Sequence, residues 1–138
     1  MALADDGFDE AKDGSSQLAE AVGSVDMRLF KGHAHEQWMG LSKVLSESST
    51  AGGSSKDIAG VRDAFYYVSK AIIDLEQVFG HAAEQDYFLT YCPMARDHTG
   101  AYWLQTVDTV YNSYYGASML RCGAIKDTLA AATTGQGN

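Results

Sequence analysis

The feature that most constrains the fold is the spacing of apolar residues from Ile58 onward. Seven of them recur at alternating intervals of three and four positions: Ile58, Val61, Phe65, Val68, Ile72, Leu75 and Phe79. This spacing places them on one face of an α-helix, so the segment should be an amphipathic helix that buries that face. Ser54 and Asp57 match the ends of a capping box before the helix, and Gly80 is suited to ending it.

Two further helices are predicted upstream. A similar apolar stripe runs from Phe8 to Leu29 and predicts one helix over about residues 3–30, with a bend or break near Gly23. A second helix is expected over 33–48, with Trp38 on its buried side. Residues 46–55 are rich in Ser, Thr and Gly without apolar periodicity, which is typical of a flexible loop.

The rest of the chain is less regular. Residues 81–91 fit either a short helix or an extended segment, and 96–100 should be a loop. Three tyrosines are expected to pack on the helices with their hydroxyls outward: Tyr111, Tyr114 and Tyr115. Ile125 and Leu129 suggest a closing helix that ends near residue 132, followed by a frayed tail over 133–138.

Together these segments predict an all-α fold. We expect an antiparallel up-down bundle of three long helices and a short C-terminal helix, with an irregular segment that carries Cys and Met. The 138 residues, 46% of them apolar, fit one domain. Within it, 1–80 would be the three-helix scaffold, 81–123 the segment with the site, and 133–138 the tail.

Composition and motifs exclude several functions. The net charge of −8 argues against nucleic acid and anionic membrane surfaces as partners. No apolar run is long enough to cross a membrane, and the first residues do not resemble a signal peptide. No phosphate-binding glycine motif, zinc-type Cys-x-x-Cys pair or nucleophile elbow occurs, so we do not expect an enzyme.

The two ends of the segment 91–123 carry sulfur. Cys92 and Met94 flank Pro93, and Met119 precedes Cys122 by three positions, which places both on one face if this part forms a helical turn. If the two ends meet, four sulfur atoms can converge on one ion. Thiolates and thioethers select monovalent copper, so the predicted metal is Cu(I) or its mimic Ag(I).

Other residues are expected near this site. His98 is a further candidate ligand, or a base that activates Cys92, or an exposed loop residue. Trp103 and Tyr115 are expected to surround the ligands, although Trp103 fits ordinary core equally well. Arg62 is expected either to brace the irregular segment, through a carboxylate or backbone carbonyls, or to lie on the surface.

Two alternatives to metal binding remain open. The first is a structural disulfide between Cys92 and Cys122, which would make the chain a disulfide-stabilised helical interaction domain without metal. A disulfide, however, makes no use of Met94 and Met119. The second is a thiol or redox enzyme that uses Cys92, although no oxyanion loop or orienting residue can be identified.

These motifs also resemble a known family. The downstream part reads Cys92-Pro93-Met94-Ala95, Gly100-Ala101-Tyr102-Trp103-Leu104, Asn112-Ser113-Tyr114-Tyr115-Gly116 and Met119-Leu120-Arg121-Cys122-Gly123, and the upstream part contributes Leu3-Ala4-Asp5-Asp6 with Arg62, Phe65 and Ser69. The pattern is similar to a bacterial family of domains of unknown function. Its members occur as small exported proteins and as a terminal domain on periplasmic adaptor subunits of copper and silver RND efflux pumps.

The resemblance implies heavy-metal binding in the periplasm or cell envelope. It implies efflux components or a metallochaperone as partners, in a chain cut from a longer precursor or adaptor. One departure is visible, because members usually have proline where this chain has Ser113. Losing that φ restraint should loosen the turn at Tyr114 and Tyr115 without removing a sulfur.

Overall fold

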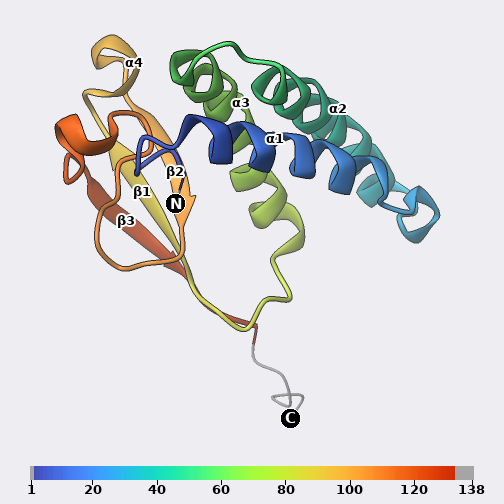
Figure 1. Ribbon diagram of the computed structural model, residues 1–138. Helices are drawn as coiled ribbons and strands as arrows, with labels where there is room; N and C mark the ends of the chain where they lie inside the picture. Colours follow the sequence, from blue (N-terminus) through green and yellow to red (C-terminus); the bar gives the residue numbers. More distant parts are fainter. Residues whose placement is uncertain (1, 133–138) are drawn as a thin grey trace.

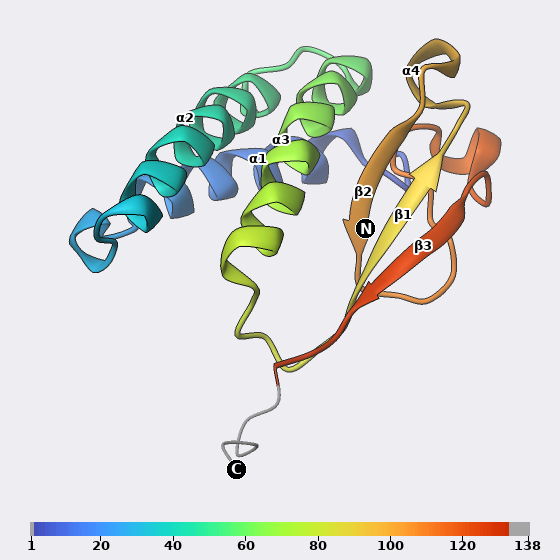
Figure 2. The same ribbon diagram turned by 180° about the vertical axis from the view of Figure 1, so that it is seen from behind.

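The computed structural model describes residues 2–132 and shows helices followed by a sheet (Figure 1). The elements in chain order are α1 (Phe8–Gly23), η1 (Met27–Leu29), α2 (His33–Gly53), α3 (Ile58–Phe79), β1 (Tyr87–Cys92), α4 (Ala95–His98), β2 (Ala101–Gln105), η2 (Gly116–Met119) and β3 (Ala124–Leu129). The prediction of an all-α bundle is therefore wrong. The three long helices lie on one side of the molecule and the antiparallel sheet on the other (Figures 1 and 2).

The predicted helix over 58–79 is confirmed as α3. It is capped by Asp57, whose carboxylate accepts a hydrogen bond of 2.8 Å from the amide of Gly60. The expected cap, Ser54, instead ends α2. Gly80 follows α3 with a φ of 67°, a left-handed value that suits glycine at this position.

The segment expected to be a flexible loop is the last two turns of α2. Ser48 and Ser49 are buried, and their hydroxyls donate to the carbonyls of Val44 and Leu45 one turn earlier. A Cβ on Gly52 would lie 2.7 Å from the hydroxyl oxygen of Ser15 in α1. The small residues therefore permit close packing between α1 and α2. Composition alone assigns these residues to a loop.

The predicted helix over 3–30 is shorter in the structure. Residues 2–6 form turns, α1 begins at Phe8, and a separate 3-10 turn follows at Met27. Asp6 has a φ of 56°, which an α-helix does not allow, and Asp26 caps the 3-10 turn by accepting from Arg28. The break near Gly23 was expected, whereas the late start was not.

The predicted closing helix is also wrong, because its residues form β3. The strand order is β2-β1-β3, with Thr90 of β1 opposite Trp103 of β2 and Ile125 of β3. Ile125 and Leu129 are four residues apart, an interval that places two side chains on one face of a helix and also on one face of a strand. Two apolar residues alone could not distinguish the two structures.

The core that supports the sheet lies between β1, β2 and the segment 106–120. Cys92, Ala95, Ala101, Trp103 and Tyr114 form its buried cluster, and Phe65 of α3 packs against it. The Tyr114 hydroxyl is buried, which contradicts the expected outward orientation, and this burial raises the pKa of the hydroxyl. Among the described residues no helix has the length and hydropathy needed to cross a membrane.

Candidate functional site

The structure brings the two cysteines together. Cys92 ends β1 and Cys122 lies just before β3, and because these strands pair, the two Sγ atoms are 3.2 Å apart. Between Cys122 and β3, Gly123 has a φ of 126°, and a Cβ there would lie 2.5 Å from the carbonyl oxygen of Tyr91. Only glycine permits this approach, so Gly123 allows the chain to place Cys122 beside Cys92.

Both cysteines are free thiols with different environments. Cys92 is fully buried, whereas Cys122 is half-buried and lines an open depression beside Pro93 and Lys126. The hydrogen bond with Cys92, followed by burial, raises the pKa of the Cys122 thiol. A metal ion that binds Cys122 as a thiolate must therefore displace its proton.

Met94 and His98 lie next to each other shortly after the end of β1. The Met94 side chain is half-buried and packs against the cluster around Cys92. Its Sδ atom is 3.2 Å from Nδ1 of His98, whose side chain is exposed. A thioether and an imidazole nitrogen, both ligands for soft metals, are thus adjacent at the surface.

The backbone that carries His98 is unusual. Arg96, Asp97 and His98 have φ values of 56°, 55° and 66°, so α4 contains a left-handed turn of three consecutive residues other than glycine. Each costs roughly 1–2 kcal/mol relative to right-handed geometry. Within the turn, Gly100 donates to the carbonyl of Ala95 at 2.9 Å. The sequence signals only a loop here.

Contacts with α3 hold the left-handed turn in place. Arg96 donates to the carboxylate of Asp63 at 2.9 Å, and its guanidinium lies 4.0 Å from the ring centroid of Tyr66. Both partners belong to α3. The turn is therefore fixed relative to a rigid element.

Met119 is placed differently from the other sulfurs. It is the last residue of η2 and is half-buried, and its carbonyl accepts a 3.0 Å hydrogen bond from the amide of Cys122. Met94 and Cys122 pack against the cluster around Cys92, and Met119 lies outside that cluster. Within residues 2–132, no group of three or more His, Cys, Asp or Glu side chains is arranged to hold a metal.

Asn112 fixes the backbone at Cys122. Its buried side chain donates to the Cys122 carbonyl at 2.8 Å and accepts from the amides of Tyr114 and Tyr115 at 2.8 and 3.1 Å. The amide of Asn112 also donates to the Leu120 carbonyl at 2.8 Å. Sequence reasoning noted Asn112 only as part of a motif and assigned it no role.

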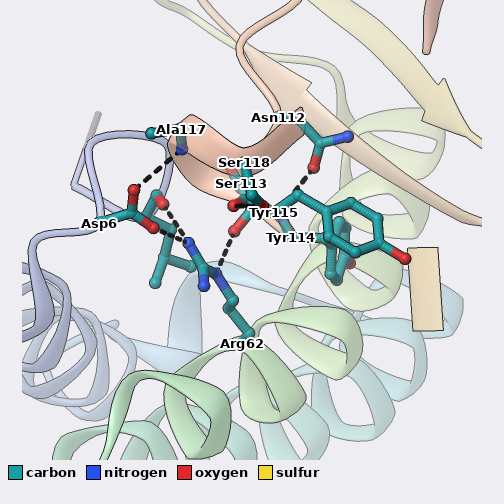
Figure 3. Close-up of polar contacts among 9 residues, drawn as sticks. Asp6, Arg62, Asn112, Ser113, Tyr114, Tyr115, Ala117 and Ser118 are labelled. Atoms are coloured by element: carbon teal, nitrogen blue, oxygen red, sulfur yellow. Dashed lines mark hydrogen bonds and ion pairs between the residues drawn. The ribbon is translucent and has the colours of Figure 1, made fainter. Parts of the chain in front are cut away.

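Arg62 connects three parts of the chain (Figure 3). It donates to the carbonyls of Ser113 and Leu3 and to the carboxylate of Asp6, each at 2.8 Å. Asp6 in turn accepts from the amide of Ala117 at 2.9 Å, and this bond, followed by that from Arg62, lowers the pKa of Asp6. Arg62 thus braces the irregular segment as expected. Ser113 contributes only its carbonyl to Arg62, which every residue type provides.

Trp103 and Tyr115 both lie near the thiols. Trp103 is fully buried in the same cluster as Cys92 and donates to Gln105 at 3.0 Å, and the Tyr115 hydroxyl donates to the Met94 carbonyl. Gln105 was missed from the sequence. Its side chain accepts from Tyr111 and donates to the carbonyls of Val107 and Thr109, so it organises the whole loop after β2.

The distance between the thiols is intermediate between two chemical states. A disulfide requires about 2.05 Å between sulfurs. Metal–thiolate bonds of about 2.3 Å place two sulfurs roughly 3.8 Å apart in tetrahedral geometry and 4.6 Å apart in linear geometry. From the observed 3.2 Å, a disulfide needs the sulfurs to approach by about 1.1 Å, and a metal needs them to separate by about 0.6 Å (tetrahedral) or about 1.4 Å (linear). The arrangement can therefore hold a soft ion or oxidise.

Comparisons with known proteins give a family but no function. No curated protein matches the chain, and no solved structure matches it. One family model, described as a protein of unknown function (DUF3347), matches residues 1–84. The matched range covers α1, α2 and α3 and includes Arg62, while both cysteines lie beyond it. Because the match spans more than half of the 138 residues, the chain belongs to the DUF3347 family.

Proposed function

We propose that this protein binds Cu(I) or Ag(I) through sulfur in the periplasm or cell envelope, for efflux or sequestration. The observation that carries the proposal is the pairing of Cys92 and Cys122 at 3.2 Å, in a cluster against which the Met94 side chain packs. Cys92 and Cys122 would supply two thiolates that offset the charge of the ion. Met94 and Met119 are the proposed thioether ligands, and His98, which lies against Met94 and not with the two cysteines, is a further candidate.

The donor set favours a soft univalent ion over other metals. Sulfur ligands select Cu(I), whereas calcium and magnesium require oxygen ligands. A structural zinc site uses four ligands, usually Cys or His. Two cysteines alone among residues 2–132 do not complete such a set, since no third His, Cys, Asp or Glu joins them. An ion that accepts thioethers fits the chain better.

The cellular context of the proposal comes from the motif resemblance. Domains with the Cys-Pro-Met and Met-Leu-x-Cys-Gly patterns resemble those attached to copper and silver efflux adaptors. Efflux components or a metallochaperone are accordingly the proposed partners. The ion would be cargo rather than a catalytic cofactor.

A second candidate function is a helical interaction domain tied by a Cys92–Cys122 disulfide. It is favoured by the position of the two thiols on paired strands, where only a small movement would join them. A thiol enzyme that uses Cys92 is less well supported, because Cys92 is fully buried, whereas reactive cysteines are generally partly exposed.

Anaerobic Cu(I) titration against a chromophoric competitor tests the proposal. We expect one ion per chain, loss of about 100-fold or more in affinity for Cys92→Ser and Cys122→Ser, and about tenfold for Met94→Leu and Met119→Leu. Met39→Leu is the matched control, because Met39 is 42% exposed on α2 and outside the site. Failure of the reduced wild type to take up copper, with a two-hydrogen mass loss in untreated protein, would instead support the disulfide.

A further inference from the structure

We infer that Met94 and His98 form an outer receiving site, from which a soft univalent ion passes inward to Cys92 and Cys122. This inference rests on the proposed function and adds an entry route and an order of ligand exchange to it. It divides the donors into an outer pair, which includes the exposed His98, and an inner pair, which includes the fully buried Cys92. The sequence motifs alone do not distinguish these pairs.

The burial of the four donors follows a gradient. His98 is exposed, Met94 is half-buried, and Cys92 is completely buried beside the half-buried Cys122. His98 Nδ1 lies 3.2 Å from the Met94 sulfur, and Met94 packs against the cluster that contains Cys92. A metal ion that approaches past Met94 therefore meets the imidazole and thioether before it reaches Cys92, whereas the depression that Cys122 lines lies beside Pro93 and Lys126.

The left-handed turn places His98 in this position. Three consecutive residues with positive φ carry the chain back over Met94, and the amide of His98 donates to the Met94 carbonyl at 3.1 Å. The Arg96 contacts with Asp63 and Tyr66 fix the turn to α3. Backbone strain of this kind is concentrated at functional sites. Here it holds an exposed nitrogen ligand over a thioether.

The proposed transfer is a ligand exchange without a change in oxidation state. The ion first binds the lone pair of neutral His98 at Nδ1 and the Met94 sulfur. The metal–nitrogen bond then breaks as bonds to Cys92 and Cys122 form, and each thiol proton leaves to solvent. Because thiolates are stronger ligands for soft ions than imidazole or thioether, the exchange runs inward.

Silver(I) titration of the Cys92→Ser/Cys122→Ser double variant isolates the outer pair. We expect this variant to keep one weak silver site. Adding His98→Asn or Met94→Leu should weaken it about tenfold or more. Asparagine is chosen because it tolerates left-handed backbone, so the turn is retained. His33→Asn is the matched control for adventitious binding, since His33 is exposed on α2.

Stopped-flow loading of the reduced protein with silver(I) tests the route. His98→Asn should slow the protection of the thiols from alkylation by about tenfold, while His33→Asn loads at the wild-type rate. Thermal denaturation verifies that each variant is folded. If the wild type binds no silver, the proposed function itself fails. If the wild type binds silver but His98→Asn loads equally fast, or the double variant holds no His98-dependent silver, the entry route is overturned.

Discussion

The carboxylate of Asp6 occupies the space that a side chain on Gly116 would need. A Cβ at residue 116 would lie 2.0 Å from Oδ1 of Asp6, and Gly116 has a φ of 60°. This close approach lets Asp6 accept from the amide of Ala117 while it also contacts Arg62. The N-terminal turn is thereby attached to the segment that leads to Cys122.

Gly116→Ala is therefore expected to destabilise the fold. The left-handed backbone alone costs alanine about 1–2 kcal/mol, and displacement of Asp6 adds to that. Urea denaturation measures the free energy of unfolding. Gly40→Ala is the control, because Gly40 lies in α2 with nothing within 4 Å of its Cβ position, and it should stabilise by up to about 1 kcal/mol. Equal stability of the two variants would contradict the role of Gly116.

Arg62→Met should destabilise by about 2–3 kcal/mol, because the Ser113 carbonyl loses its side-chain donor and Asp6 loses its ion pair, while the Leu3 carbonyl keeps the 3.3 Å bond from the amide of Asp6. The same urea denaturation checks this value. Arg28→Met is the matched control, since Arg28 is 90% exposed and its ion pair with Asp26 is local. That variant should change stability by less than about 0.5 kcal/mol. A comparable loss of stability in both variants would show that Arg62 does not join the N-terminal turn to the segment at Ser113.

The sequence predicts the helices better than the sheet, and the difference is physical. The seven apolar residues of α3 give a repeated signal, whereas β3 offers two apolar residues at an interval shared by helix and strand. Sequence composition does not predict the end of α2, because the hydroxyls of Ser48 and Ser49 donate to carbonyls within the helix and Gly52 packs against α1. Such contacts depend on a neighbouring helix that local sequence does not reveal.

The site is likewise only partly visible in the sequence. Ligand softness predicts Cys92, Met94, Met119 and Cys122 as ligands, but the proximity of the two cysteines arises from strand pairing that was not predicted. The left-handed turn at His98 depends on Arg96 reaching α3, a contact between residues 33 positions apart. Gln105 and Asn112 act through bonds to backbone groups, which leave no pattern in the sequence.

The hydrogen bond between His81 and Glu76 predicts that the protein becomes less stable as the pH rises above neutral. Its two ring nitrogens face acceptors, the Glu76 carboxylate at 2.5 Å and the Gln85 carbonyl at 3.1 Å, so both bonds are made only by the protonated ring. The bond to Glu76 raises the pKa of His81, and the negative charge of Asp86 adds a smaller effect. Because the folded pKa exceeds the unfolded value, this stabilisation is complete below about pH 6.5 and is lost as pH rises through the folded pKa.

Urea denaturation between about pH 6 and pH 9 measures this dependence. Glu76→Gln should flatten the alkaline fall in stability, because the neutral amide no longer favours the charged ring. His33→Asn should leave the profile unchanged, as His33 is exposed and contacts only side chains of its own helix. An equally steep profile in Glu76→Gln would exclude His81 as its source.

The reactivity of the two thiols follows from their shared hydrogen bond. Cys122 is half-buried and Cys92 is fully buried, so iodoacetamide should modify Cys122 first. The rate of Cys122 alkylation at neutral pH should fall below that of free cysteine, because the bond to Cys92 raises the pKa of Cys122 and the thiolate is the nucleophile.

Cys92→Ala removes that bond and should accelerate alkylation of Cys122. In Cys122→Ala, alkylation of Cys92 should stay slow because Cys92 remains buried. Mass spectrometry of timed samples distinguishes the sites, and slower alkylation of Cys122 in Cys92→Ala would mean that Cys92 activates its neighbour, as a thiol enzyme requires.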